Sequence, residues 1–421
     1  MIKRLVLCAA FLYATNGAFA GDGSPLSSKG VGAFTSFAGG YSVGMGNAGL
    51  ALLYNASLSR LNPATWSALQ NVQFSALYDF SGVSSQDNLS NESSYLVNGN
   101  FGGGIFGIPI DRDLGISLAM GFTPLTSFQY QFNSAIAATA ETPSATYVNT
   151  GSGGLGEGFL GTSLSPFKEL ALGGMFTYAF GRTERTGQVT FSNTSYTNTF
   201  SDNSLYLHGS SGTLGLTLSH LDDLVKLDFL HGLSIAGYYK LSYNLKGNSQ
   251  LSNTYSDGLD TAFTSFAAGY IPPEYGIGIA ENFSGRLSAV LDIRTQQLSR
   301  YSDSFTNPGT FGDVLFVGGG IQYMRGKAID ALYDKQILRA GFYYEKTQYI
   351  VPTKSGQNKQ LDELFLTAGI EVPLSYSSTI NVSAQYGFRG LSNDLPIQER
   401  IFRLYVSVTL GEVWFIRPVG D

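Results

Sequence analysis

Apolar and polar residues alternate one by one over many short stretches of the chain. In residues 380–388 every second side chain is apolar or aromatic, and the residues between are Asn, Ser, Gln and Gly. Residues 402–410 repeat the alternation with Phe, Leu, Val, Val and Leu. A period of two places side chains on alternate faces of a β-strand and would scramble the faces of a helix. The pattern therefore predicts strands that have one apolar and one polar face.

Weaker copies of this alternation predict about fourteen strands. They fall at residues 71–80, 99–110, 114–123, 153–166, 170–193, 204–219, 232–247, 273–283, 285–299, 313–325, 337–348, 362–373, 379–389 and 401–411. The connections alternate between tight turns, such as residues 111–113, and long polar stretches, such as residues 81–98, 124–152 and 248–272. An even number of strands with short periplasmic turns and longer external loops is typical of bacterial outer-membrane barrels. Two longer turns, 220–231 and 326–336, have apolar residues at helical spacing, which predicts short amphipathic helices.

The composition favours a membrane barrel over a soluble β-sandwich. Charged residues make up only 13% of the chain, about half the usual share, whereas aromatic residues also reach 13%. Neutral polar residues balance the apolar ones, as expected for a wall with lipid on one side and a polar lumen on the other. Aromatic residues gather near strand ends, as at Tyr343 and Tyr344, which is typical of the interfacial girdles of such barrels.

Residues 1–20 have the features of a secretory signal peptide. Lys3 and Arg4 precede ten apolar residues, and Ala18-Phe19-Ala20 fits the small-x-small cleavage pattern. Ten apolar residues cannot cross a hydrocarbon core of about 30 Å, and no later stretch reaches the 18 apolar residues of a helical span. The signal peptide contains Cys8, the single cysteine, so we expect a mature chain without disulfides or thiolate metal sites. Without Lys3 and Arg4 the 25 basic residues become 23, against 31 acidic ones, which argues against nucleic-acid binding.

The segment between the signal peptide and the first predicted strand, residues 21–70, lacks the alternation. Gly, Ala and Ser dominate residues 30–51, yet several large apolar side chains disfavour disorder. We therefore predict four parts: a signal peptide (1–20), a plug or hatch (21–70), a transmembrane barrel (71–415) and a short C-terminal extension (416–421). Within the hatch, residues 50–61 could form one short helix that ends before Pro63, because the residue before a proline avoids the helical region.

Two motifs in the hatch resemble catalytic signatures. Residues 44–49, GMGNAG, match the G-x-G-x-x-G of dinucleotide-binding folds, but no buried strand precedes them and no acidic residue follows at the required distance. Residues 40–44, GYSVG, match the G-x-S-x-G nucleophile elbow, which needs a strand-to-helix turn and a partner histidine. None of the three histidines, His208, His220 and His231, lies in a partner motif, and without cysteines they make no metal site. We predict no enzyme and no cofactor; a Ser–His hydrolase that uses Ser42 or His208 is the catalytic alternative.

Several charged residues alternate with the apolar positions of their strands. On the lipid face each would cost about 2–4 kcal/mol at the bilayer midplane, so we expect them to face the lumen. They are Arg286, Asp292, Arg294, Arg339, Arg389 and Arg403. Two roles are open: an ion-pair network that holds the plug, or a grip on the carboxylate of a ligand.

Taken together, these features resemble the FadL-type outer-membrane transporters of long-chain fatty acids and other hydrophobic compounds. The resemblance rests on the signal peptide, GMGNAG, the tripeptide Asn62-Pro63-Ala64 and about fourteen strands, and extends to residues 273–280 and 338–344. It implies a barrel whose hatch includes Gly44, Gly46, Asn47, Asn62, Pro63 and Ala64. It also implies an apolar pocket and lateral release beside a kinked third strand. We take Phe34, Phe37, Tyr41 and Met45 as candidates either for lining this pocket and binding ligand or for packing the hatch. The predicted third strand ends at Pro124, which is a candidate for the kink.

The sequence thus predicts a barrel in the outer membrane of a Gram-negative bacterium that takes up hydrophobic molecules such as long-chain fatty acids. Its expected partners are outer-membrane lipid and the hydrophobic substrate. Loops 81–98 and 124–152 lack the long apolar helical stretches that an external capture groove would need. A barrel of the same family that acts as a protein-secretion shuttle, or that docks a secreted or surface protein, is the alternative.

Overall fold

The computed structural model describes most of the chain after residue 23. The described residues are 24–35, 39–54, 58–87, 93–139, 142–193, 195–222, 226, 231–255, 260–304, 306–326, 335–392 and 394–412. Phe37, the predicted signal peptide, the C-terminal extension and most of the two predicted periplasmic helices lie outside these residues. No described helix has both the length and the apolar character needed to cross a membrane.

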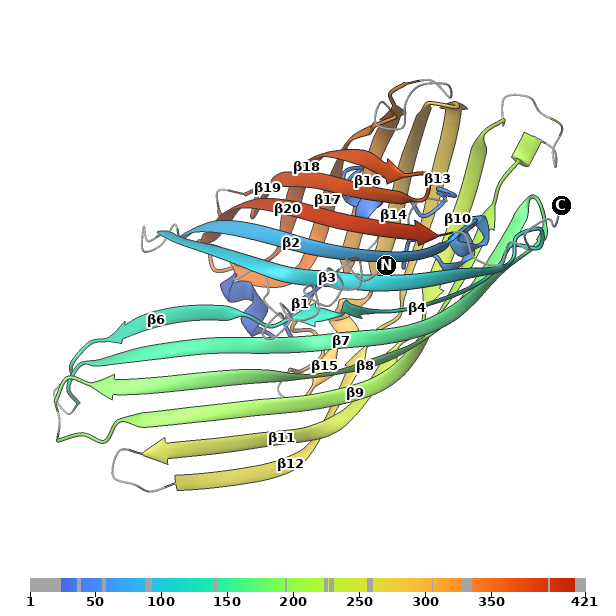
Figure 1. Ribbon diagram of the computed structural model, residues 1–421. Coiled ribbons are helices and arrows are strands. Elements are labelled where there is room, and N and C mark those ends of the chain that lie inside the picture. The colour runs from blue at the N-terminus through green and yellow to red at the C-terminus, as the bar shows by residue number, and fades with distance from the viewer. Residues whose placement is uncertain are drawn as a thin grey trace.

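Fourteen antiparallel strands close into a barrel, as the alternation predicts (Figure 1). In order around the wall they are β2 (Val72–Asp87), β3 (Ser93–Asp111), β4 (Ile116–Pro124), β7 (Ala145–Phe167), β8 (Leu170–Phe191), β9 (Thr199–Leu218), β10 (Leu233–Lys240), β13 (Glu274–Ser284), β14 (Leu287–Gln296), β16 (Val314–Met324), β17 (Ile337–Pro352), β18 (Asn358–Ser375), β19 (Ser378–Arg389) and β20 (Ile397–Glu412). The pairing of β20 with β2 closes the ring.

The two faces of the wall differ as expected for a membrane barrel. Along β8 the exposed side chains include Leu172, Phe176, Tyr178 and Phe180, and alternate residues from Met175 to Ala179 are buried. Beyond Phe180 the outward positions become Arg182, Glu184, Thr186 and Gln188. A membrane-spanning strand needs about 9–11 residues, and β8 has 22. The outer half of β8 therefore extends beyond the membrane, on the side opposite the short turns.

Six strands continue beyond the ring as one sheet, which we call the wing (Figure 1). The order of its strands is β6–β7–β8–β9–β11–β12, where β6 is Tyr130–Ile136, β11 is Tyr243–Tyr255 and β12 is Asp260–Ile271. The outer halves of β7, β8 and β9 form its centre, and β6 and β12 form its margins. Residues 241–242 and 272–273 mark the points where β10 becomes β11 and where β12 becomes β13.

The wing corrects the prediction that residues 124–152 and 248–272 are long polar loops. Most of both stretches is strand: β6 and the start of β7 in the first, β11 and β12 in the second. Strand β12 and most of β6 expose side chains on both faces. Because neither face requires apolar residues, the alternation that reveals membrane strands is missing there.

The N-terminal segment, residues 24–69, fills the lumen, as predicted for a plug, and we call it the hatch. Its elements are η1 (Pro25–Ser28), β1 (Ala33–Phe34), α2 (Gly40–Val43) and η2 (Pro63–Ala68). The helix predicted over residues 50–61 is absent from the described part of that range. Pro63 instead begins η2, and Asn62 caps it by accepting a hydrogen bond from the Ala64 amide. This arrangement suits a proline at the first helical position, where no amide hydrogen is needed.

Candidate functional site

The hatch lies against the barrel wall with almost no space between the two backbones at its glycines. Gly46 has a φ of 68°, and a Cβ added there would lie 2.1 Å from the carbonyl oxygen of Phe342. The wall facing this turn also consists of glycines: a Cβ at Gly320 or Gly341 would meet the backbone of Met45 at 2.6 Å. Glycine alone permits such an approach, so the GMGNAG motif serves backbone packing.

Polar side chains of the wall bind the backbone of this same turn. The Asp292 carboxylate accepts hydrogen bonds from the amides of Gly49 (2.7 Å) and Leu50 (3.1 Å). Across the turn, the Thr367 hydroxyl accepts from the Gly46 amide at 2.9 Å and donates to the Gly44 carbonyl oxygen at 3.0 Å. Strands β14 and β18 thus hold the hatch from two directions.

Asn47 and its neighbours receive a third set of bonds. Gln385 on β19 donates to the Val43 carbonyl oxygen and to the Asn47 side chain, both at 3.1 Å. Arg294 on β14 donates to the Asn47 carbonyl oxygen at 3.3 Å. The left-handed conformation of Asn47, with a φ of 54°, is one that asparagine tolerates.

The tripeptide Asn62-Pro63-Ala64 anchors the other end of the hatch. The Asn62 amide group donates to the Leu50 carbonyl oxygen at 3.0 Å and to the Thr217 hydroxyl of β9 at 2.9 Å. Wall glycines make room again: a Cβ at Gly215 would lie 2.1 Å from the Asn62 side-chain oxygen. Asn62 is therefore both a helix cap and a link to the wall.

Two buried carboxylates of the wall, Glu157 and Glu371, also bind the hatch through its side chains. Arg60 of the hatch pairs with Glu157 of β7, which also accepts from Lys240 of β10 at 3.2 Å. On the other side, the Tyr54 hydroxyl donates to Glu371 of β18. Glu157 and Glu371 are buried and Lys240 is partly buried, so losing one partner would leave a costly isolated charge in the lumen.

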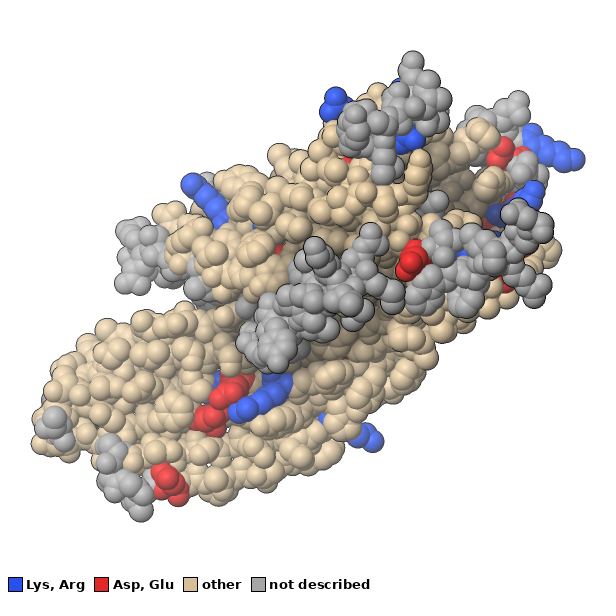
Figure 2. Space-filling view, viewed as in Figure 1, with Lys and Arg blue, Asp and Glu red and all other residues tan. Residues whose placement is uncertain are grey.

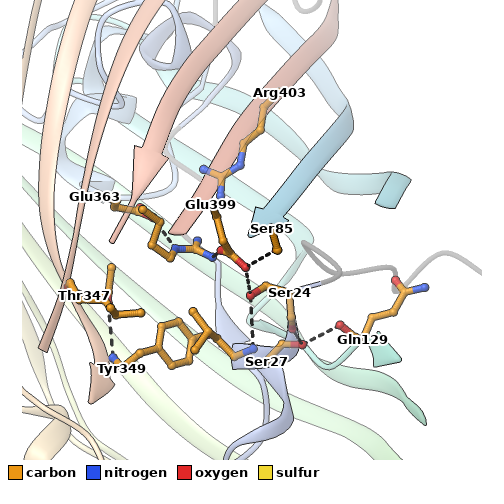
Figure 3. Close-up of polar contacts among 12 residues, drawn as sticks. Ser24, Ser27, Ser85, Gln129, Thr347, Tyr349, Glu363, Glu399 and Arg403 are labelled. Carbon is orange, nitrogen blue, oxygen red and sulfur yellow. Dashed lines mark hydrogen bonds and ion pairs between the residues drawn. The ribbon is translucent and has the colours of Figure 1, made fainter. Parts of the chain in front are cut away.

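A network at the outer end of the lumen fixes the start of the hatch (Figure 3). The Ser24 hydroxyl donates to Glu399 at 2.6 Å, and Ser85 donates to the same carboxylate oxygen at 2.9 Å. Arg389 bridges Glu399 and Glu363 at 2.8 and 2.9 Å. Strands β2, β18, β19 and β20 therefore meet at this point.

An aromatic column crosses the lumen wall between two arginines. Phe316, Tyr343 and Phe365 stack on neighbouring strands with ring centroids 5.6 and 4.8 Å apart. Arg294 lies 3.7 Å from the Phe316 ring centroid and Arg403 lies 4.9 Å from that of Phe365, which is cation–π geometry. The column ties together five strands of the wall.

The predicted lumen charges separate into two groups. Asp292, Arg294, Arg339, Arg389 and Arg403 all join the lumen contacts; Arg339 bonds Glu371 and Asn381, each at 2.6 Å. Arg286 differs, because β14 begins only at Leu287 and leaves Arg286 exposed in the turn before it.

Four wall residues that bind the hatch were not identified from the sequence: Glu157, Thr367, Glu371 and Gln385. Their positions alternate with lipid-facing residues, which is the one signal that could have identified them.

The candidate ligand residues do not share a pocket among the described residues. Tyr41 and Met45 are fully buried in hatch packing, and Tyr41 packs against Tyr54. Phe34 lines a lumen cavity of about 100 Å³ together with Arg60, Lys240, Glu274, Arg294 and Glu345. Pockets for drug-sized ligands measure roughly 300–1,000 Å³ and are mostly apolar. The described cavity is smaller, and these charged side chains lie among the apolar residues that line the rest of it.

The catalytic alternatives find no support in the geometry. The Ser42 hydroxyl is buried and donates to the Gly39 carbonyl oxygen at 2.9 Å. His208 contacts the Tyr178 hydroxyl at 3.2 Å, and both side chains are exposed on the outer face of the wall. Within the described residues, no group of three His, Cys, Asp or Glu side chains could hold a metal ion.

Comparison with known proteins gives a family and a fold. A family model described as BamG matches residues 1–418. No curated protein sequence matches the chain. Solved structures with the same fold include the toluene transporter TbuX of Ralstonia pickettii (TM-score 0.59, 14% identity, 89% of this chain and 98% of that chain covered). A FadL homologue of Pseudomonas aeruginosa is also similar (TM-score 0.58, 12% identity, 89% and 98% covered). So is the toluene transporter TodX of P. putida (TM-score 0.56, 14% identity, 92% and 100% covered).

Proposed function

Because the chain belongs to the BamG family, we propose that it is a sealed outer-membrane barrel that works as an accessory component of the BAM complex. In this proposal the protein acts through its outer surface, conducts no solute and catalyses no reaction. The family name supports the association with the BAM complex, and the outer-membrane barrel fold is compatible with it.

The observation that carries the proposal is the attachment of the hatch around the lumen. Asp292 of β14, Thr367 of β18, Thr217 of β9 and Glu157 of β7 each bind it. A hatch that opens during transport would have to break several of these buried bonds, and each buried polar group left without a partner costs about 1–3 kcal/mol. Static scaffolding requires none of them to break.

The test is purification of the full-length protein, carrying an affinity tag, from outer membranes in a mild detergent. We expect other BAM subunits to copurify in near-stoichiometric amounts, measured by mass spectrometry. Another tagged outer-membrane barrel from the same cells is the control. Recovery of BAM subunits at the level of this control would overturn the proposal.

Uptake of hydrophobic molecules is the second candidate, and a break in the third strand favours it. Strand β4 ends at Pro124, and the next residues form β5 (Thr126–Ser127), which pairs with β1 of the hatch. The chain then returns to the wall as β6, which pairs with β7. No described ladder joins β6 to residues 93–103 of β3. The solved transporters of toluene share the overall fold, which supports the same candidate.

Deletion of residues 62–64 tests uptake directly. If the hatch gates a hydrophobic substrate, the deletion should lower uptake of labelled long-chain fatty acid and of toluene while the barrel still assembles. Heat-modifiable migration in detergent checks assembly. Unchanged uptake in an assembled deletion variant would exclude this candidate and leave the BAM proposal unaffected.

A further inference from the structure

The margin of the wing at β12 is a sheet edge that lacks the usual protection. On one side β12 pairs with β11 along residues 260–271. On the other side the described contacts are confined to its inner end, where Gly269 and Tyr270 pair with β15 (Ser302–Asp303) and Ser304 bonds Ala268. The described residues form no ladder on that side of residues 260–267. In a β-strand, alternate residues direct both N–H and C=O toward one side, so about four residues here offer free backbone groups.

Natural edge strands normally carry charges, prolines or bulges that prevent pairing with another chain. Residues 261–271 of β12 contain none of the charged residue types and no proline. Asp260, at the outer end of β12, is the one charged residue of this strand, whereas Arg182, Glu184 and Asp202 lie on the inner strands β8 and β9. Most of the wing surface in Figure 2 carries neither acidic nor basic side chains.

Both faces of this edge also expose a large aromatic side chain. Phe263 is 64% exposed and Phe266 is 70% exposed. Because the two residues are three positions apart, their side chains point to opposite faces of the sheet. An added strand would lie beside both of them and could cover part of each with its own alternating side chains.

A second copy of this chain does not fit the edge. Two barrels in one membrane that form a symmetric dimer are related by a two-fold axis along the membrane normal. That rotation makes the two β12 strands parallel and places each backbone group opposite the identical group of the other copy. N–H then faces N–H and C=O faces C=O, so no ladder of hydrogen bonds forms. A symmetric dimer of this chain therefore leaves the edge unpaired, and we take the occupant to be a different polypeptide.

We propose that residues 260–267 of β12 accept an extended strand of a second, surface-exposed polypeptide by β-strand addition. The partner segment spans about eight residues, is uncharged opposite residues 261–267 and has apolar side chains at alternate positions. Because Asp260 is exposed at the outer end of the edge, a basic residue opposite it would strengthen the pairing. This inference rests on the proposed function and specifies where such an accessory barrel would bind a partner.

The first experiment introduces a photo-crosslinking amino acid at position 263 or 266 of the full-length protein in living cells. Strand addition predicts that both positions crosslink to the same short segment of one partner, mapped by mass spectrometry. The matched control is position 283, because Phe283 is also 64% exposed but lies at the periplasmic end of β13. Crosslinks from only one position, or to another copy of this chain, would overturn the proposal.

The second experiment compares two pairs of lysine substitutions. A262K with T264K places charge on the edge, whereas S252K with Q250K places the same charge on the directly opposite residues of β11. Both pairs start from exposed side chains. We expect the edge pair to lower partner recovery by about tenfold, as loss of a strong interface contact does. We expect the β11 pair to leave it unchanged.

The outcomes separate this inference from the proposed function. If the crosslinked partner is recovered with the edge variant at the wild-type level, strand addition at β12 is wrong, and the BAM association is judged separately by copurification with the wild type. If BAM subunits fail to copurify with the wild type while both crosslinks form, the BAM association is wrong and strand addition at β12 stands. Heat-modifiable migration confirms that each variant assembles.

Discussion

The lumen, which the hatch fills, and the wing are built partly from the same strands, and they differ in burial, in charge and in the pairing of their backbone. At the level of the hatch, many inward side chains are buried and polar or charged, and several of them bond the hatch. A few residues further out, β12 and most of β6 expose both faces, and the described residues leave long parts of their outer edges unpaired. The hatch is bonded to the wall at many points, whereas the margin of the wing has backbone groups without a described partner. This contrast suggests that binding takes place at the wing and that the hatch provides stability.

The largest effect is expected from a side chain placed where the hatch touches the wall. Gly46→Val would require both a left-handed β-branched residue and a shift of the Phe342 carbonyl, at a combined cost of about 2–6 kcal/mol. We expect a displaced hatch and a conductance in planar bilayers that the wild type lacks. Gly285→Val is the matched control, since a Cβ there meets nothing within 4 Å. A closed, assembled Gly46→Val barrel would show that this contact does not seal the lumen.

A pair of phenylalanine substitutions compares the two regions directly. Phe365 is fully buried in the aromatic column, whereas Phe266 is exposed on the wing. We expect Phe365→Ala to lower the free energy of unfolding by about 3–5 kcal/mol. Phe266→Ala should change it by less than about 0.5 kcal/mol. Urea unfolding in lipid vesicles measures both, and equal losses would remove the distinction between a packed lumen and an open margin.

Two aspartates provide a similar test of the polar contacts. Asp292→Asn keeps the shape of the side chain but turns an N–H group toward one of the two amides that the carboxylate now binds. We expect a loss of about 1–3 kcal/mol and faster proteolysis of the hatch. Asp260→Asn, on the exposed edge of the wing, should leave both quantities unchanged. The comparison fails if both variants are cleaved at the same rate.

The smallest effect concerns the cap of η2. Asn62→Ala removes the hydrogen bond to the Ala64 amide and the bond to Thr217, and loss of a helix cap costs about 0.5–2 kcal/mol. Hydrogen exchange should report faster opening of η2 while the described contacts of Asp292 and Thr367 keep the rest of the hatch in place. Exchange that increases throughout the hatch would mean that Asn62 controls the whole segment.

The fourteen strands and the plug were predictable because their physical cause is local. A strand with lipid on one side must alternate, as residues 380–388 do, and that alternation is visible in a single short window. The outer strands were predicted as loops for the opposite reason. Residues 260–267 expose both faces, so their side chains follow no period that the sequence could display.

The hatch shows the same division between local and distant causes. Its composition and its lack of alternation predicted a plug. The alternation of Asp292, Arg294, Arg339 and Arg389 with apolar residues predicted that these charges face the lumen. Their partners could not be assigned, because the Gly49 amide meets Asp292 across 243 residues of sequence. The role of the candidate pocket residues depends on the wall in the same way. An apolar side chain in a hatch can face a cavity, as Phe34 does, or fill the packing, as Tyr41 and Met45 do, and only the position of the wall decides between the two.

The sequence by itself determined that the protein is a membrane β-barrel, how many strands form the ring and which segment fills the lumen. Each of these follows from the pattern of side chains along the chain. Only the tertiary structure decided which strands of the wall bind the hatch. It also decided that β12 lies at the margin of the wing, where the described residues form no ladder beside residues 260–267. These two features depend on which strands become neighbours, and closure of the ring brings together residues that are hundreds of positions apart.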